Sequence, residues 1–142
     1  DDEVEITEGI VKGKFTLLKI LPQKYKTFII LYEKYLEKNK KKWAKDIILE
    51  AAKRYPDEIE VYAKLGKVYE MLEHYGFAID AYLAGLEREK GNEDLRYYLA
   101  LSYEKLFEES GKDMYRMKAK EQWVLLMDDK KYKKEAQEYL KR

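Results

Sequence analysis

Few side chains in this sequence have the types and spacing that chemistry requires. His74 is the only histidine and there is no cysteine, which excludes the usual zinc sites and a Cys–His nucleophilic pair. Ser102 and Ser110 have no histidine nearby in the sequence to activate their hydroxyls. Gly9 and Gly13 lack the lysine and the spacing of a phosphate-binding loop. We therefore predict no catalytic residue, no metal site and no cofactor, and we expect His74 to be an exposed turn residue.

Along the rest of the sequence, a pattern of residue types recurs with a period of 34 residues. Its central copy places an aromatic, a leucine, a second aromatic and a small residue at Tyr62, Leu65, Tyr69 and Ala78. The same pattern stands one period earlier at Phe28, Leu31, Tyr35 and Ala44. One period later, the first three positions hold Arg96, Leu99 and Tyr103. A fixed period of this length indicates a protein built from stacked repeats.

Each repeat is predicted to be a pair of helices. The chain has only two prolines and seven glycines, and its apolar residues recur at i, i+3, i+4 and i+7. We predict three repeats and a C-terminal capping helix, over residues 25–58, 59–92, 93–129 and 130–142. Residues 1–24 form an N-terminal segment that we predict to be partly helical, over Ile10–Leu21, or disordered.

The third repeat departs from the period in its second half. The small residue and the aromatic stand at Ala119 and Trp123, seven residues later than the period requires. Because seven residues are about two helical turns, the simplest interpretation is a longer second helix. We expect Trp123 to pack in the core of its own repeat.

Composition limits the partners and the location of the protein. The 29 basic and 28 acidic side chains give a net charge of +1, so nothing attracts nucleic acid or an anionic membrane to the chain as a whole. No apolar run approaches the roughly 18 residues of a membrane span. The chain begins without methionine and is expected to be a fragment, so we favour the cytoplasm but leave a periplasmic or membrane-anchored location open. The richness in Lys and Glu suits a thermophilic source.

The repeating residues resemble the tetratricopeptide repeat. The middle copy carries Tyr62, Leu65, Gly66, Tyr69, Ala78, Tyr82 and Gly85 at the family positions. The first copy has Tyr32 in place of the glycine, and the third has Arg96 in place of the first aromatic. The resemblance covers about residues 25–129. It implies an all-α, right-handed α-solenoid of helix–turn–helix repeats whose first helices line a concave groove.

The resemblance also implies a role as an interaction scaffold or adaptor that binds a protein or peptide in the groove. The positions of this chain that we predict to bind the partner are Ile29, Lys64, Lys67, Met71, Tyr97, Tyr98 and Leu101. Some family members hold acidic chaperone tails with basic side chains, but this chain has Ile29, Glu33, Asp94 and Tyr98 at those positions, so we do not expect such a clamp. The groove is expected to be apolar and aromatic instead.

Other uses of these surfaces stay open at the level of sequence. The N-terminal segment, the terminal helix or another copy of the chain could cover the groove, and the alternative function is self-association as a homo-oligomer. Five lysines between Lys38 and Lys45 form a basic cluster that could touch phosphate or anionic lipid. Since the chain is nearly neutral, we interpret this cluster as a solvated charge run.

Overall fold

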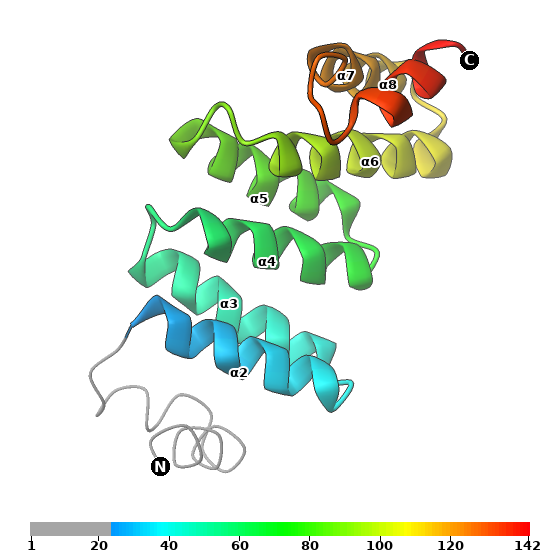
Figure 1. Ribbon diagram of the computed structural model, residues 1–142. Helices are drawn as coiled ribbons and strands as arrows, with labels where there is room; N and C mark the ends of the chain where they lie inside the picture. Colours follow the sequence, from blue (N-terminus) through cyan, green and yellow to red (C-terminus); the bar gives the residue numbers. More distant parts are fainter. Residues whose placement is uncertain (1–23) are drawn as a thin grey trace. The chain divides into compact units, whose positions relative to one another are not determined.

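The computed structural model describes residues 24–142, and this part of the chain contains seven helices and no strand (Figure 1). The predicted helix over Ile10–Leu21 lies outside the described residues. The helices are α2 (Tyr25–Glu37), α3 (Lys41–Arg54), α4 (Ile59–Met71), α5 (Tyr75–Arg88), α6 (Glu93–Ser110), α7 (Asp113–Leu125) and α8 (Lys133–Leu140). The predicted all-α fold is confirmed.

The turns inside the first two hairpins repeat with the period of the sequence. Asn39 and Glu73 both adopt left-handed backbone angles, with φ of 57° and 61°. After each of them the chain closes back on the preceding helix. The amide of Lys40 donates to the carbonyl of Tyr35 (2.8 Å), and the amide of His74 donates to the carbonyl of Tyr69 (2.9 Å). Because each of these residues lies 34 positions from its counterpart, the period in side-chain types is also a period in backbone geometry.

The described residues divide into two compact units, and the boundary falls inside α4, between Val61 and Tyr62. In the first unit α2 packs against α3. The ring of Tyr55, just after α3, meets the edge of Phe28 with the ring centroids 5.9 Å apart. The residues that the pattern assigns to this core are buried: Phe28, Leu31, Tyr35, Ala44, Ile48 and Ala51.

In the second unit, small residues bring neighbouring helices close together. A Cβ atom at Gly66 of α4 would lie 2.2 Å from the ring of Tyr82 of α5, so only glycine leaves room for that ring. A Cβ atom at Gly85 would lie 2.7 Å from the side chain of Leu95 of α6. The glycines therefore set how closely α5 approaches the helices on either side of it.

The seven additional residues of the third repeat lengthen the first helix of the hairpin, whereas the second helix, α7, has 13 residues against 14 in α5. α6 has 18 residues, five more than the 13 of α4. Ala119 is the seventh residue of α7, whereas its counterpart Ala78 is the fourth residue of α5. The turn between the helices is one residue shorter. The prediction of a longer second helix is therefore wrong, because most of the insertion lies in the first helix.

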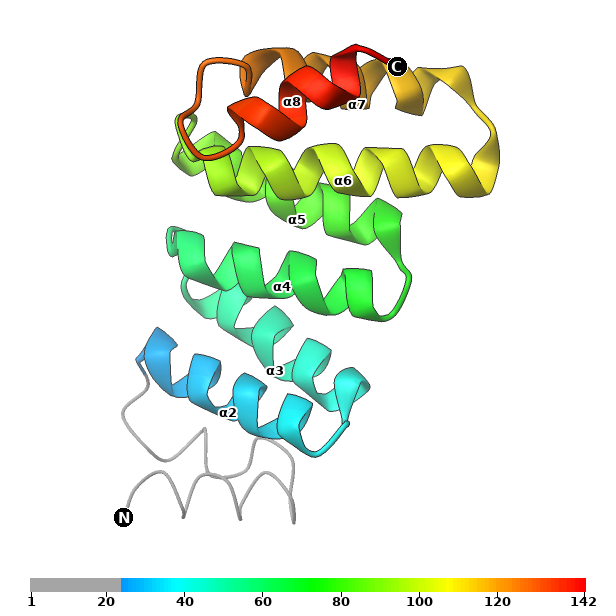
Figure 2. The same cartoon turned by 45° about the vertical axis from the view of Figure 1, so that its right-hand side comes forward.

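The end of α6 is set by Gly111, which adopts a left-handed φ of 69° and donates its amide hydrogen to the carbonyl of Phe107 (2.8 Å). Glycine at this position is a common helix stop. Figure 2 shows the last turns of α6 running past the start of α5 toward this turn. We refer to residues 106–118 as the extended tip.

The last helix caps the second unit. The carboxylate of Asp129 accepts hydrogen bonds from the backbone amides of Lys131 and Tyr132 (3.0 Å each), and this turn directs the chain into α8. Tyr132 and Ala136 are buried, whereas the Lys- and Glu-rich side of the helix is exposed. Both views place α8 beside α7 and α6 (Figures 1 and 2). A polar outer face of this kind is what the end of a repeat stack requires.

Candidate functional site

The predicted groove residues Lys67, Tyr97 and Tyr98 are brought together in the second unit. The ammonium group of Lys67 on α4 lies 3.5 Å from the centre of the Tyr98 ring on α6. The Tyr98 ring in turn lies 5.8 Å from that of Tyr97 and 5.7 Å from that of Tyr82. A cation at this distance from a ring face is attracted by the ring quadrupole. The face shared by α4 and α6 therefore carries a cation held over an aromatic cluster.

The position of Lys67 is fixed by a second contact on its own helix. Its ammonium group lies 3.6 Å from the carboxylate of Glu70. The same carboxylate accepts a hydrogen bond from the hydroxyl of the buried Tyr82. Glu70 thus links the surface lysine to the core ring that Gly66 accommodates.

Tyr97 is covered by the C-terminal part of the chain. Its ring stacks on that of Tyr132, with centroids 4.2 Å apart, and meets the edge of the Trp123 ring at 5.7 Å. Its hydroxyl donates to the carboxylate of Glu135 on α8 (2.8 Å). Burial, together with this hydrogen bond, raises the pKa of Tyr97 to about 12. The terminal helix is one of the segments that the sequence analysis named as able to cover the groove.

Asp94, at the start of α6, binds the same C-terminal segment that covers Tyr97. Its carboxylate accepts hydrogen bonds from the hydroxyl of Tyr132 and from the ammonium group of Lys131 (3.0 Å). The hydrogen bond from Tyr132, followed by that from Lys131, lowers the pKa of Asp94. These bonds stabilise the ionised carboxylate, and they tie the segment before α8 to α6.

The other predicted groove residues are more accessible or lie elsewhere. Leu101 is half-buried on α6, Lys64 is half-buried on α4, and Met71 at the end of α4 is 44% exposed. Ile29 lies on α2 in the first unit, half-buried. The sequence did not assign Glu135 or Glu104 to the site. Tyr132 could have been found, since it heads the apolar side of the predicted capping helix.

Two solved structures of MamA resemble this chain. One has a TM-score of 0.62 at 22% sequence identity and covers 90% of this chain and 68% of its own. The other has a TM-score of 0.61 at 20% identity and covers 94% of this chain and 89% of its own. The chain has a tetratricopeptide-type repeat fold. No protein-family model matches the sequence, and no curated protein matches it.

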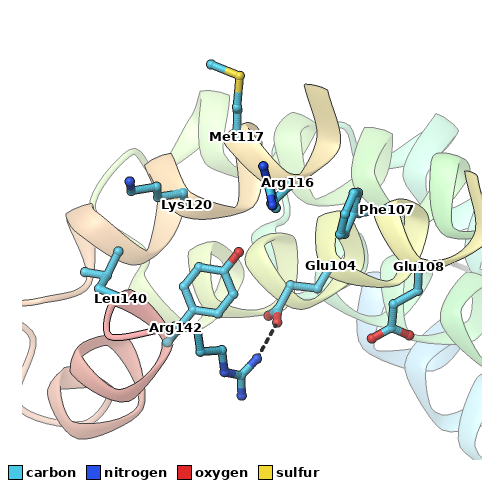
Figure 3. Close-up of a pocket in the computed structure, with 9 residues that line it drawn as sticks. Glu104, Phe107, Glu108, Arg116, Met117, Lys120, Leu140 and Arg142 are labelled. Atoms are coloured by element: carbon cyan, nitrogen blue, oxygen red, sulfur yellow. Dashed lines mark ion pairs between the residues drawn. The ribbon is translucent and has the colours of Figure 1, made fainter. Parts of the chain in front are cut away.

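A cleft of about 470 Å³ lies on this repeat fold where α8 ends, between the second halves of α6 and α8 and the start of α7 (Figure 3). Glu104 accepts a hydrogen bond from the indole N–H of Trp123 (3.1 Å) and pairs with Arg142 at 3.6 Å. Burial raises the pKa of this carboxyl. Trp123 is 3% exposed and its ring stacks on Tyr139 at 5.3 Å, so it packs in the core as predicted.

Ser102, Ser110 and His74 are the residues that the sequence analysis first considered for catalysis or metal binding. Ser102 is fully buried in α6, and the hydroxyl of Ser110 accepts a hydrogen bond from the amide of Lys112 (3.2 Å). His74 is exposed at the turn before α5. Within residues 24–142 no group of three or more His, Cys, Asp or Glu side chains is arranged to hold a metal ion. None of the helices in the same range combines the length and apolar character needed to cross a bilayer.

Proposed function

We propose that this chain is a protein-interaction scaffold that binds a partner peptide or helix on the face shared by α4 and α6. The observation that carries this proposal is the Lys67–Tyr98 contact at 3.5 Å, beside the exposed Met71 and the half-buried Leu101. Aromatic rings and a fixed cation on an apolar surface are typical of binding hot spots. We propose no catalytic role for the chain.

The candidate residues have different parts in this proposal. Tyr98, Leu101 and Met71 supply apolar contact area, and Lys67 supplies a positioned cation. Tyr97 supports the neighbouring Tyr98, because its own ring is held in place by contacts with Tyr132 and Trp123. Lys64 on α4 is included in the proposed surface, and Ile29 on α2 is proposed to bind the partner within the first unit.

The proposal is tested with a photo-crosslinking amino acid that replaces Leu101 in the otherwise unchanged full chain. A matched chain carries the same group at Glu87 of α5, whose side chain is 79% exposed. We expect a discrete crosslinked partner from position 101 in native lysate and none from position 87. The partner identified in this way should bind the Tyr98→Ala/Leu101→Ala variant about tenfold more weakly or worse.

A control substitution separates loss of contact from loss of fold. Leu125→Ala removes an apolar side chain that is 57% exposed on α7 and should leave binding unchanged. Circular dichroism should give the same helicity for all variants. Equal crosslinking from positions 101 and 87, or full binding by the double variant, would contradict the proposal.

Self-association is the second candidate, and an exposed face of α7 favours it. Met114, Met117, Val124 and Leu125 fall on one side of this helix and are 50–64% exposed. Apolar side chains that gather on one exposed face often mark an interface. Light scattering over a range of protein concentrations tests this candidate, because a monodisperse monomer at every concentration excludes it.

A further inference from the structure

A second cleft lies beside the extended tip, and its lining residues do not include Lys67 or Tyr98. This cleft of about 710 Å³ lies between the first half of α5, the last turns of α6 and the start of α7. In the second repeat the first helix of the hairpin, α4, is five residues shorter than α6, so that hairpin has no counterpart of the last turn of α6. The cleft is therefore a consequence of the seven-residue insertion.

The walls of the cleft are aromatic and apolar. Phe77 is 59% exposed although its ring contacts Tyr69 (5.4 Å) and His74 (6.0 Å), so it is held in place and still faces solvent. Leu83, six residues further along α5, is 39% exposed. Tyr103 lies in the cleft lining and is 6% exposed. An exposed phenyl ring in a cleft with apolar walls is a surface suited to an apolar anchor.

Carboxylates dominate the charge around this aromatic surface. Glu73, Asp80 and Glu109 line the cleft, and Lys118 is the only Lys or Arg side chain among the lining residues. In the described part of the chain, none of the three carboxylates has a cation within ion-pair distance. The nearby charges of Glu121 and Asp80 add to burial in raising the pKa of Tyr103. The cleft is thus acidic, in a chain whose net charge is +1.

An acidic aromatic cleft is complementary to a cationic group with an apolar stem. A Lys or Arg side chain can lay its methylene groups on a ring and place its charge against a carboxylate. The chain already makes such a contact on the face shared by α4 and α6, where Lys67 lies over Tyr98. The cleft opens along three helices rather than enclosing a small volume, so its shape fits a peptide segment better than a small molecule.

We propose that the cleft between Phe77, Asp80 and Glu109 binds a basic, amphipathic segment of a partner protein. This site is separate from the α4–α6 surface, and its existence does not depend on the function proposed for that surface.

The experiment uses a fluorescent peptide of about 15 residues with leucine and lysine in helical amphipathic order. A second peptide has glutamate at every lysine position. Fluorescence anisotropy should give an affinity for the lysine peptide about tenfold higher than for the glutamate peptide. The Asp80→Lys/Glu109→Lys variant should bind the lysine peptide about tenfold more weakly, and Phe77→Ser should weaken binding as well.

Two controls locate the binding. Glu87→Lys/Glu138→Lys changes the net charge by the same amount at exposed positions outside the cleft lining and should alter the affinity by less than about twofold. Tyr98→Ala/Leu101→Ala should leave the affinity unchanged. Circular dichroism checks that each variant keeps its helicity.

Three results would overturn the proposal. The first is equal affinity of the wild-type chain and the charge-reversed cleft variant for the lysine peptide. The second is loss of binding in Tyr98→Ala/Leu101→Ala, which would place the peptide on the other surface. The third concerns a peptide of residues 9–23, which contains Lys12, Lys14 and Lys19 and no acidic residue. If this peptide bound the cleft more tightly than the designed one, the occupant would be the chain itself rather than a partner.

Discussion

The hairpins α2–α3 and α4–α5 have the same turn geometry but opposite distributions of side-chain volume. At one pair of equivalent positions the first hairpin has Tyr32 and Ile48, and the second has Gly66 and Tyr82. Tyr32 and Tyr82 are both buried, with exposures of 2% and 0%. A tyrosine can thus come from either helix of the pair. The repeat places one large ring at this pair of positions, and either helix can supply it.

The third hairpin has a small residue on its first helix and a large ring on its second helix, as the second hairpin does. Ala100 stands at the position of Gly66, and Trp123 stands at the position of Tyr82 after the insertion is taken into account. Both residues are buried. In all three hairpins, therefore, one large aromatic ring is buried at this pair of positions.

The largest effect expected from this comparison is that of Gly66→Ala. The new Cβ would lie 2.2 Å from the Tyr82 ring, and the ring would have to move away from Glu70. Overpacking costs about 1–3 kcal/mol and outweighs the roughly 1 kcal/mol that alanine contributes to helix stability. We expect the free energy of unfolding, measured by urea denaturation, to fall by about 1–2 kcal/mol.

Two further variants sharpen this prediction. Gly76→Ala places a Cβ where no atom lies within 4 Å and should not destabilise the protein. Adding Tyr82→Leu to Gly66→Ala should recover part of the loss, because the smaller side chain leaves room for the methyl group. If Gly66→Ala were as stable as the wild type, the volume argument for the second hairpin would be wrong.

A smaller effect is expected at the turns that the first two hairpins share. Glutamate in the left-handed region costs about 1 kcal/mol, whereas asparagine is better tolerated there. Glu73→Gly should therefore raise the free energy of unfolding by about 0.5–1 kcal/mol, and Asn39→Gly should change it less. Gly111→Ala, which forces alanine into φ of 69°, should lower it by about 1 kcal/mol. Thermal denaturation of the three variants measures these differences, and a loss of stability in Glu73→Gly would contradict the strain argument.

The smallest effect is local and depends on pH, and it separates the third repeat from the other two. At the position of Tyr97 the earlier repeats have Ala63 and Ile29, which do not ionise. The pKa of Tyr97 rises from 10.0 to about 12, and that of Tyr132 is also raised, mainly by burial. A raised folded-state pKa contributes stability that is complete below pH 10 and is lost as the pH rises through about 12.

We therefore expect α8 to loosen between pH 10 and 12 while the first two hairpins stay folded. Amide hydrogen exchange resolved by segment measures this, with tyrosinate absorbance recording the ionisation. Tyr97→Phe keeps the ring and removes the ionisable group, so it should shift the loosening to higher pH. Simultaneous loss of all helices at alkaline pH would show that the cover is not a separate feature of the third repeat.

Sequence reasoning found the helices and the core because both depend on spacing. Phe28, Leu31 and Tyr35 recur at helical intervals, and their burial follows from that alone. The position of the third turn was harder to derive. Gly111 is the physical signal for it, but the 34-residue period pointed to an earlier turn and the small residue at Ala119 suggested a later one.

The candidate site could be predicted only in part. The positions of Lys67, Tyr97 and Tyr98 on first helices follow from the repeat, but the cation–ring contact joins residues about 30 positions apart and depends on how α4 and α6 pack. The cover over Tyr97 depends on the path of the segment around Tyr132, which the capping contact of Asp129 sets. No periodic rule gives that path. The acidic cleft depends in turn on the length of the extended tip.

The length of the extended tip has a consequence for how this molecule can change. Within α7 the insertion adds three residues before Ala119, and three residues correspond to 300° of helical rotation, about 60° short of one full turn. An insertion of this size leaves Ala119 and Trp123 facing inward, as their burial records. An insertion shorter or longer by one residue would turn them by about 100° and bring Lys120 or Val124 toward the interior. The part of the tip that precedes Ala119 in α7 can therefore change its length only in steps close to a whole turn, and each such step alters the cleft without disturbing the framework beneath it.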